Sequence, residues 1–200
     1  MKKKLAILDY QMSNMFSVRN ALEFLGFEPL VVSEASESLS SADGAVLPGV
    51  GAFGEAMQRL KDQNLISAIK DFIRSGKPFM GICLGLQLLF SESDEFGITP
   101  GLDIIKGRVE SFAKNEKIRR IPHTGWNKIY KKGGDSGEYM YFVHSFYANP
   151  QDKSKVETTT EYEGFSFCSS VRQKNVYACQ FHPEKSGPAG LKILKEFFNN

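Results

Sequence analysis

Two apolar segments of different pattern meet in Lys77-Pro78-Phe79-Met80-Gly81-Ile82-Cys83-Leu84-Gly85-Leu86-Gln87-Leu88-Leu89-Phe90. The first half of this stretch is a short apolar run after a Gly-Lys-Pro turn, which is typical of a buried strand. From Leu84 onward, apolar residues at 84, 86, 88, 89 and 90 predict a helix packed on that strand. The G-x-C-x-G sequence between the two has the form of a nucleophile elbow, a sharp strand-to-helix turn that needs small flanking residues. Cys83 would lie at a helix N-terminus, where the dipole favours a thiolate. A buried structural cysteine in a glycine-flanked contact fits the same residues.

Strands and helices alternate in the first part of the chain. Apolar patterns predict strands at 5–8, 29–32, 45–47 and 78–81, and helices over 15–25, 54–60 and 64–74. This alternation predicts an α/β fold with a doubly wound, mostly parallel sheet flanked by helices. After about residue 100, short apolar segments separated by Gly, Asn and Lys predict strands and hairpins, some in a smaller antiparallel β layer, before a last helix over about 188–198. No linker divides the chain, so we expect a single domain, residues 1–200.

Composition narrows the class of protein. With 42% hydrophobic and 24% charged residues and a net charge of +2, the chain gives no reason to expect a nucleic-acid or membrane partner. The apolar run Leu5 to Leu8 is too short for a signal peptide, and no stretch approaches the roughly 20 apolar residues of a membrane span. Three cysteines without a C-x-x-C pair favour free thiols and a cytoplasmic location. The histidines show no metal-ligand spacing, so we expect neither a metal nor another cofactor.

A base for a reactive thiol is available near the C-terminus. Thiol catalysis needs a base to take the proton from sulfur and a third group to orient that base. His182 stands in Gln180-Phe181-His182-Pro183-Glu184, directly after the predicted strand 176–179. A histidine and a glutamate two residues apart at a strand end can point the same way, with the proline fixing the backbone between them. A polar strand exit without catalytic meaning would have the same sequence.

Gly-Ile-Cys-Leu-Gly-Leu-Gln at 81–87 together with Phe-His-Pro-Glu at 181–184 resembles the class I glutamine amidotransferases, a family with a flavodoxin-like fold. The resemblance implies a glutaminase that hydrolyses the side-chain amide of glutamine to give glutamate and ammonia. It further implies that Cys83 is the nucleophile, His182 the general acid and base, and Glu184 its orienting group. Gln87 matches the motif glutamine that contacts the bound substrate.

A glycine cluster, Pro48-Gly49-Val50-Gly51-Ala52-Phe53-Gly54, follows another predicted strand. It matches the dinucleotide fingerprint G-x-G-x-x-G by letter, but the acid at the required distance, Asp71, lies inside a helical run rather than at a strand end. In the family, this segment is an oxyanion strand. The resemblance implies that the backbone N–H near Val50 and Gly51, together with that of Leu84, stabilises the negative charge that develops in the reaction.

Further segments narrow the resemblance within the family. Pro122-His123-Thr124-Gly125-Trp126-Asn127, Tyr141 to Tyr147 and His182 to Ser186 resemble the glutaminase subunits of imidazole glycerol phosphate synthase. The resemblance implies a heterodimer with a (β/α)8 cyclase subunit, to which ammonia passes for histidine biosynthesis. The same resemblance assigns the remaining residues: Ser145 and Phe146 would line the glutamine site through their backbone, and Asn14, Trp126, Tyr141 and His144 would face the partner.

One segment departs from that pattern. The family has Asp-Tyr-Gly-x-Gly-Asn after its first strand, whereas this chain has Asp9-Tyr10-Gln11-Met12-Ser13-Asn14, with both glycines replaced by residues that resist positive φ. A paralogous glutaminase that supplies ammonia for amidine formation on a surface sugar therefore also fits the sequence. A second alternative is a γ-glutamyl hydrolase that uses the same Cys-His-Glu residues and needs no partner. A binding module that kept the fold without catalysis is the remaining alternative.

Overall fold

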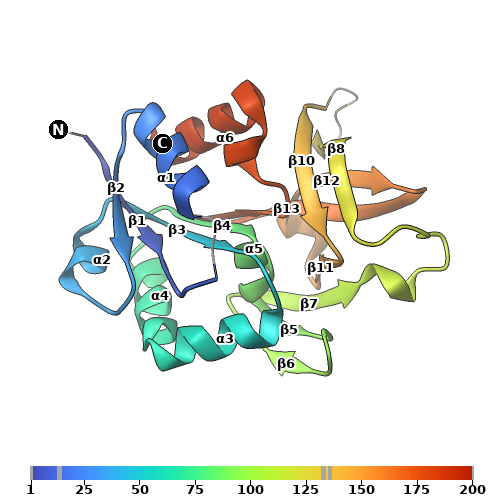
Figure 1. Cartoon of the computed structure of the whole chain (residues 1–200), viewed down its shortest axis with the longest axis horizontal. Coiled ribbons are helices and arrows are strands. Elements are labelled where there is room, and N and C mark those ends of the chain that lie inside the picture. Colours follow the sequence, from blue (N-terminus) through green and yellow to red (C-terminus); the bar gives the residue numbers. More distant parts are fainter. Residues whose placement is uncertain (1, 13–14, 132–133, 135–136, 200) are drawn as a thin grey trace.

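The computed structural model describes residues 2–12, 15–131, 134 and 137–199, and a twisted sheet runs through it (Figure 1). One half of this sheet is parallel, in the order β2 (Glu28–Val32), β1 (Lys4–Leu8), β3 (Gly44–Gly49), β4 (Phe79–Cys83) and β14 (Val176–Cys179). β14 comes from the C-terminal part of the chain and pairs in parallel with β4, so that Cys179 lies beside Ile82. Residues that leave β4 and β14 at their carboxyl ends therefore meet.

Helices cover both faces of the parallel half (Figure 1). On one face lie α1 (Met15–Phe24) and α6 (Gly187–Asn199), and on the other lie α2 (Glu37–Ser41), α3 (Phe53–Asp62) and α4 (Leu65–Arg74). Residues of β1 alternate between two apolar cores: Leu5 and Ile7 pack with the first set of helices, Ala6 and Leu8 with the second. Successive side chains alternate because the strand is pleated. The helices on both faces make the sheet doubly wound.

The other half of the sheet is mostly antiparallel. It continues from β14 through β13 (Phe165–Gln173), β11 (Phe146–Pro150), β7 (Ile105–Ser111), β5 (Phe90–Ser93) and β6 (Thr99–Pro100). Off this path, β12 (Val156–Tyr162) pairs with β13, and β9 (Tyr130–Lys131) pairs with β12. A separate antiparallel ribbon joins β8 (His123–Lys128) to β10 (Tyr139–His144). Short 3₁₀ turns complete the chain: η1 (Phe112–Lys114), η2 (Lys153–Lys155) and η3 (Pro183–Lys185). The predicted α/β fold with a smaller antiparallel layer is confirmed.

The predicted helix after Cys83 is too long. α5 (Leu84–Leu88) is one short turn, and Phe90 already belongs to β5. The chain that returns from the β5–β6 hairpin takes the carbonyls that a longer helix would use, because Leu102 N–H donates to Leu88 O (2.8 Å) and Asp103 N–H to Phe90 O (3.1 Å). Tertiary hydrogen bonds thus end the helix where the apolar pattern continues. None of the helices in the described residues is long and apolar enough to cross a membrane.

Candidate active site

Cys83 lies at a strained turn between β4 and α5. Its φ of 55° and ψ of −109° are unusual for a residue with a side chain, as expected at a nucleophile elbow. The glycines on either side are required by space: a Cβ on Gly81 would lie 2.7 Å from Gly85 O, and one on Gly85 only 1.8 Å from Leu47 O. The G-x-C-x-G sequence therefore lets β4, α5 and β3 pack backbone to backbone while Cys83 projects from the turn.

His182 and Glu184 form a buried pair beside this turn. β14 runs parallel to β4, so the chain that leaves β14 passes the end of β4 and carries His182 there. His182 Nδ1 lies 2.9 Å from Glu184 Oε1, and both side chains are almost fully buried. Since a carboxylate can only accept, Nδ1 donates and Nε2 is left free. Nε2 makes no hydrogen bond to any residue that the structure describes.

The charge state of His182 is set by its neighbours. Burial by itself lowers the pKa of an imidazole, but the Cys83 sulfur and the Glu184 carboxylate outweigh it and raise the pKa of His182 to about 10. The surroundings of His182 therefore favour its imidazolium form. Such an imidazolium can donate its proton to a leaving group, and once neutral it can accept one from water.

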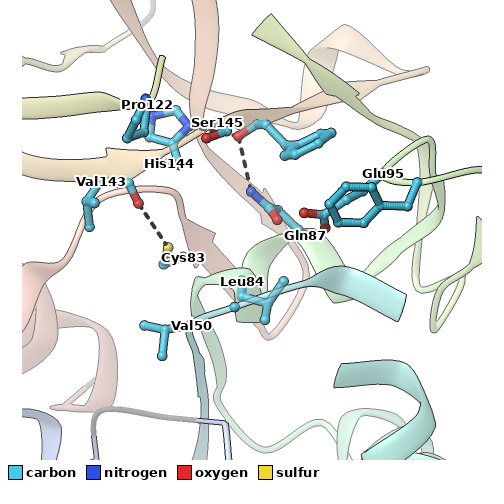
Figure 2. Close-up of a pocket in the computed structure, with 12 residues that line it drawn as sticks. Val50, Cys83, Leu84, Gln87, Glu95, Pro122, Val143, His144 and Ser145 are labelled. Atoms are coloured by element: carbon cyan, nitrogen blue, oxygen red, sulfur yellow. Dashed lines mark hydrogen bonds between the residues drawn. The ribbon is translucent and has the colours of Figure 1, made fainter. Parts of the chain in front are cut away.

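A cavity of about 420 Å³ opens in front of Cys83 (Figure 2). Several predicted site residues line it together with residues that were not predicted: Val50, Gly51, Cys83, Leu84, Gln87, Glu95, Phe96, Pro122, Val143, His144, Ser145 and Phe146. The Cys83 sulfur faces the Val143 carbonyl oxygen at 3.9 Å, and Gln87 Nε2 donates to Phe146 O at 3.1 Å. The cavity thus brings together residues that lie far apart in the sequence. They come from the end of β3, from α5 and from β10–β11.

Glu95 is a candidate substrate residue that no motif indicated. It lies in the β5–β6 turn, where Oε2 accepts the backbone N–H of Phe53 at 2.7 Å and the side chain lines the cavity. A carboxylate in this place can bind an ammonium group. No local pattern marks Glu95, because it reaches the cavity only through the hairpin that begins at Phe90.

The segment after β3 is tied to the loop after β1. The N–H of Val50 donates to Met12 O (2.8 Å), and the Tyr10 hydroxyl donates to Pro48 O (2.9 Å). Gly51 has φ +108°, and a Cβ there would lie 2.7 Å from Met12 Cε. The Val50 N–H is thus engaged away from the cavity, so its predicted oxyanion role requires this peptide to turn.

The loop after β1 adopts a conformation that its sequence disfavours. Gln11 takes φ 64° although it is not glycine. Its N–H donates to Asp9 Oδ1 (2.9 Å), and its Oε1 accepts from Arg59 Nη1 (2.9 Å). These bonds compensate for the left-handed backbone at the position where the family has its first glycine.

The residues expected at the partner interface divide by exposure. Trp126 is 53% exposed, and its ring lies 6.0 Å from that of half-buried Tyr141. His144 is buried: Nδ1 donates to Phe146 O at 2.7 Å, and Nε2 lies 2.9 Å from His123 Nδ1. Burial and the neighbouring His123 lower the pKa of His144 to about 3. The His144 side chain therefore points inward. Asn14 lies outside the described residues.

Within the described residues, no group of His, Cys, Asp and Glu side chains has a geometry that could hold a metal.

Comparison with known proteins gives concordant results. The sequence profile of the family described as glutamine amidotransferase class-I matches residues 6–200. The chain is 50% identical over 198 residues to the imidazole glycerol phosphate synthase subunit HisH of Aquifex aeolicus, covering 96% of this chain and 94% of that protein. It is 46% identical to the HisH subunit of Syntrophotalea carbinolica, covering 96% and 98%.

Solved structures resemble the fold at much lower sequence identity. A crystal structure of a glutamine amidotransferase superposes with a TM-score of 0.77 at 20% identity, covering 98% of this chain and 99% of that one. The PurLQS structure from Thermotoga maritima gives a TM-score of 0.78 at 21% identity, covering 100% and 99%.

Proposed function

The chain belongs to the class-I glutamine amidotransferases, among the HisH subunits of imidazole glycerol phosphate synthase, and on this premise we propose that Cys83, His182 and Glu184 hydrolyse glutamine. The function is that of a glutaminase subunit, which converts glutamine to glutamate and ammonia for histidine biosynthesis. The assignment of these residues rests on the elbow at Cys83, which opens on a cavity of about 420 Å³. The buried His182–Glu184 pair lies beyond the end of the neighbouring strand β14.

In the proposed reaction, the Cys83 thiolate attacks the side-chain amide carbon of glutamine. The oxyanion that forms accepts the N–H of Leu84, the first residue of α5, and the N–H at Val50 or Gly51 once that peptide has turned. His182 donates its Nε2 proton to the amide nitrogen, the C–N bond breaks, and ammonia leaves a thioester on Cys83. Neutral His182 then takes a proton from water, which attacks the thioester and releases glutamate.

The cavity walls suggest how glutamine is held. Glu95 would pair with the α-ammonium group of the substrate, and the backbone of Ser145 and Phe146, which line the same cavity, would contact the rest of the molecule. Gln87 lines the same cavity as Cys83, and there it would contact the bound substrate. A whole-chain domain of this kind, with free thiols at Cys83, Cys168 and Cys179, suits a reducing compartment such as the cytoplasm.

We further propose that a (β/α)8 cyclase subunit accepts the ammonia and activates the site. Exposed Trp126 and the adjoining Tyr141 on the β8–β10 ribbon offer an aromatic surface beside His182, whose ring lies 6.4 Å from that of Tyr141. Because the Val50 N–H is bound to Met12 O, we expect the isolated subunit to hydrolyse glutamine slowly.

The test is ammonia release from glutamine, measured with and without a purified (β/α)8 cyclase subunit of imidazole glycerol phosphate synthase that holds its ligand. We expect activity to rise at least about 100-fold with the partner, the gain typical of one added oxyanion donor. Trp126→Ala should abolish the rise, whereas Phe24→Ala, which removes an even more exposed aromatic ring from α1, should not. Equal rates with and without the cyclase would instead identify a partner-independent γ-glutamyl hydrolase, and activation only by a sugar-modifying partner would identify the paralogous glutaminase.

A further inference from the structure

Gln180 contacts the nucleophile, although neither the catalytic motif nor the proposed mechanism uses it. It follows β14 directly, its side chain is completely buried, and its Nε2 lies 3.6 Å from the Cys83 sulfur. Its own backbone N–H donates to Ser169 O at 2.9 Å, which fixes the residue to β13. Burying an amide N–H group without an acceptor is costly, so the contact of the Gln180 NH₂ group with the sulfur is significant.

The orientation of the Gln180 amide follows from its neighbours. Gln87 Nε2 lies 3.1 Å from Phe146 O and 3.0 Å from Gln180 Oε1. A backbone carbonyl can only accept, so the atom of Gln87 at this position must be its amide nitrogen. That nitrogen then requires an acceptor from Gln180, which must present its oxygen to Gln87 and its NH₂ group to the sulfur.

We propose that Gln180 holds Cys83 as a thiolate by donating an amide N–H to its sulfur. A thiolate only accepts hydrogen bonds, so a fixed N–H donor in this buried place favours the charged sulfur over the thiol. Gln180 thereby works from the same strand exit as His182, one through an amide and the other through an imidazole. The hydrogen bonds from Phe146 O through Gln87 and Gln180 to the sulfur also connect the wall of the cavity to the nucleophile. This role deepens the proposed glutaminase site and rests on it.

The test is the pH dependence of alkylation of Cys83 by iodoacetamide, followed by mass spectrometry of the modified peptide. In Gln180→Met, which keeps the length but has no donor, we expect the pH midpoint to rise by about one unit, so that alkylation at lower pH is about tenfold slower. Gln180→Glu, which has the shape of the native residue, should shift the midpoint further in the same direction because its charge opposes the thiolate. The control is Gln173→Met on the same β13–β14 hairpin, whose amide bonds Ile104 O at 3.0 Å, and it should leave the midpoint unchanged.

A midpoint in folded Gln180→Met or Gln180→Glu equal to that of the wild type would overturn the proposal, and thermal unfolding of each variant establishes that it is folded. Should Gln180→Met fail to fold, the isosteric Gln180→Glu alone decides. Alkylation needs no turnover, so a raised midpoint supports the role of Gln180 even in a protein that does not hydrolyse glutamine. An unchanged midpoint refutes that role even in an active glutaminase.

Discussion

Glu184→Gln tests whether the carboxylate charge, rather than its hydrogen bond alone, sets the state of the catalytic base. The substituted amide keeps the shape and can still accept from His182 Nδ1, but it removes a negative charge 2.9 Å away. At an effective dielectric constant of about 20, two unit charges at that distance attract by about 6 kcal/mol, or about 4 pKa units. The Cys83 contribution remains, and solvent relaxation returns part of the loss. We therefore expect the pKa of His182 to fall from about 10 by at least about 2 units.

The measurement is an NMR titration of ¹⁵N-labelled histidine side chains, with the His182 signal assigned by its loss in His182→Asn. Glutamine hydrolysis should fall about 100- to 10,000-fold, as when other catalytic histidines lose an orienting charge. Glu23→Gln is the matched control, because it breaks an exposed i,i+4 pair with Arg19 on α1 and should change neither quantity. A His182 pKa within about 0.5 unit of wild type in Glu184→Gln would refute the electrostatic reasoning.

Three further substitutions test other parts of the structure. Burial lowers the pKa of His144 to about 3. The folded state therefore resists a proton that the unfolded chain takes up below about pH 6.5, and the free energy of unfolding falls as the pH drops from about 6.5 toward 3. His144→Gln should therefore reduce the loss of unfolding free energy between pH 7 and pH 5, measured in urea, by about 2 kcal/mol, and an unchanged loss would exclude His144 as its source. Gly85→Ala places a Cβ 1.8 Å from Leu47 O and should cost about 3 kcal/mol or more in chemical unfolding, whereas Gly54→Ala, with 3.6 Å of clearance, should cost less than about 1 kcal/mol. Gly51→Ala forces a side chain onto φ +108° and should cost about 1–3 kcal/mol; a cost of zero in the same assay would mean that this backbone is not constrained.

The nucleophile and its base could be predicted from sequence because each depends on short-range chemistry. The glycines beside Cys83 are required by backbone contacts, and His182 and Glu184 are two residues apart at a strand end. Glu95 and Gln180 could not be predicted in this way. Glu95 reaches the cavity through a hairpin that the apolar pattern at 88–90 concealed, and Gln180 acts on Cys83 only because β14 inserts beside β4.

The loop after β1 shows the limit of conformational preference. Gln11 was expected to resist a positive φ, yet it adopts 64° because Asp9 and Arg59 each bond it. Arg59 lies on α3, so the bond that supports this backbone joins segments 48 residues apart. A propensity describes one residue in isolation, whereas a contact with a distant helix can outweigh about 1–2 kcal/mol of local strain.

In the proposed mechanism Cys83 forms a covalent bond with the substrate, and rapid acid quenching during turnover of glutamine labelled in its carbon skeleton would trap that bond. We predict that the peptide containing Cys83 carries a γ-glutamyl group bound as a thioester, and that neither label nor ammonia release remains in Cys83→Ala. Ammonia release by Cys83→Ala within tenfold of the wild-type rate, or label on a different residue, would contradict the assignment of the nucleophile.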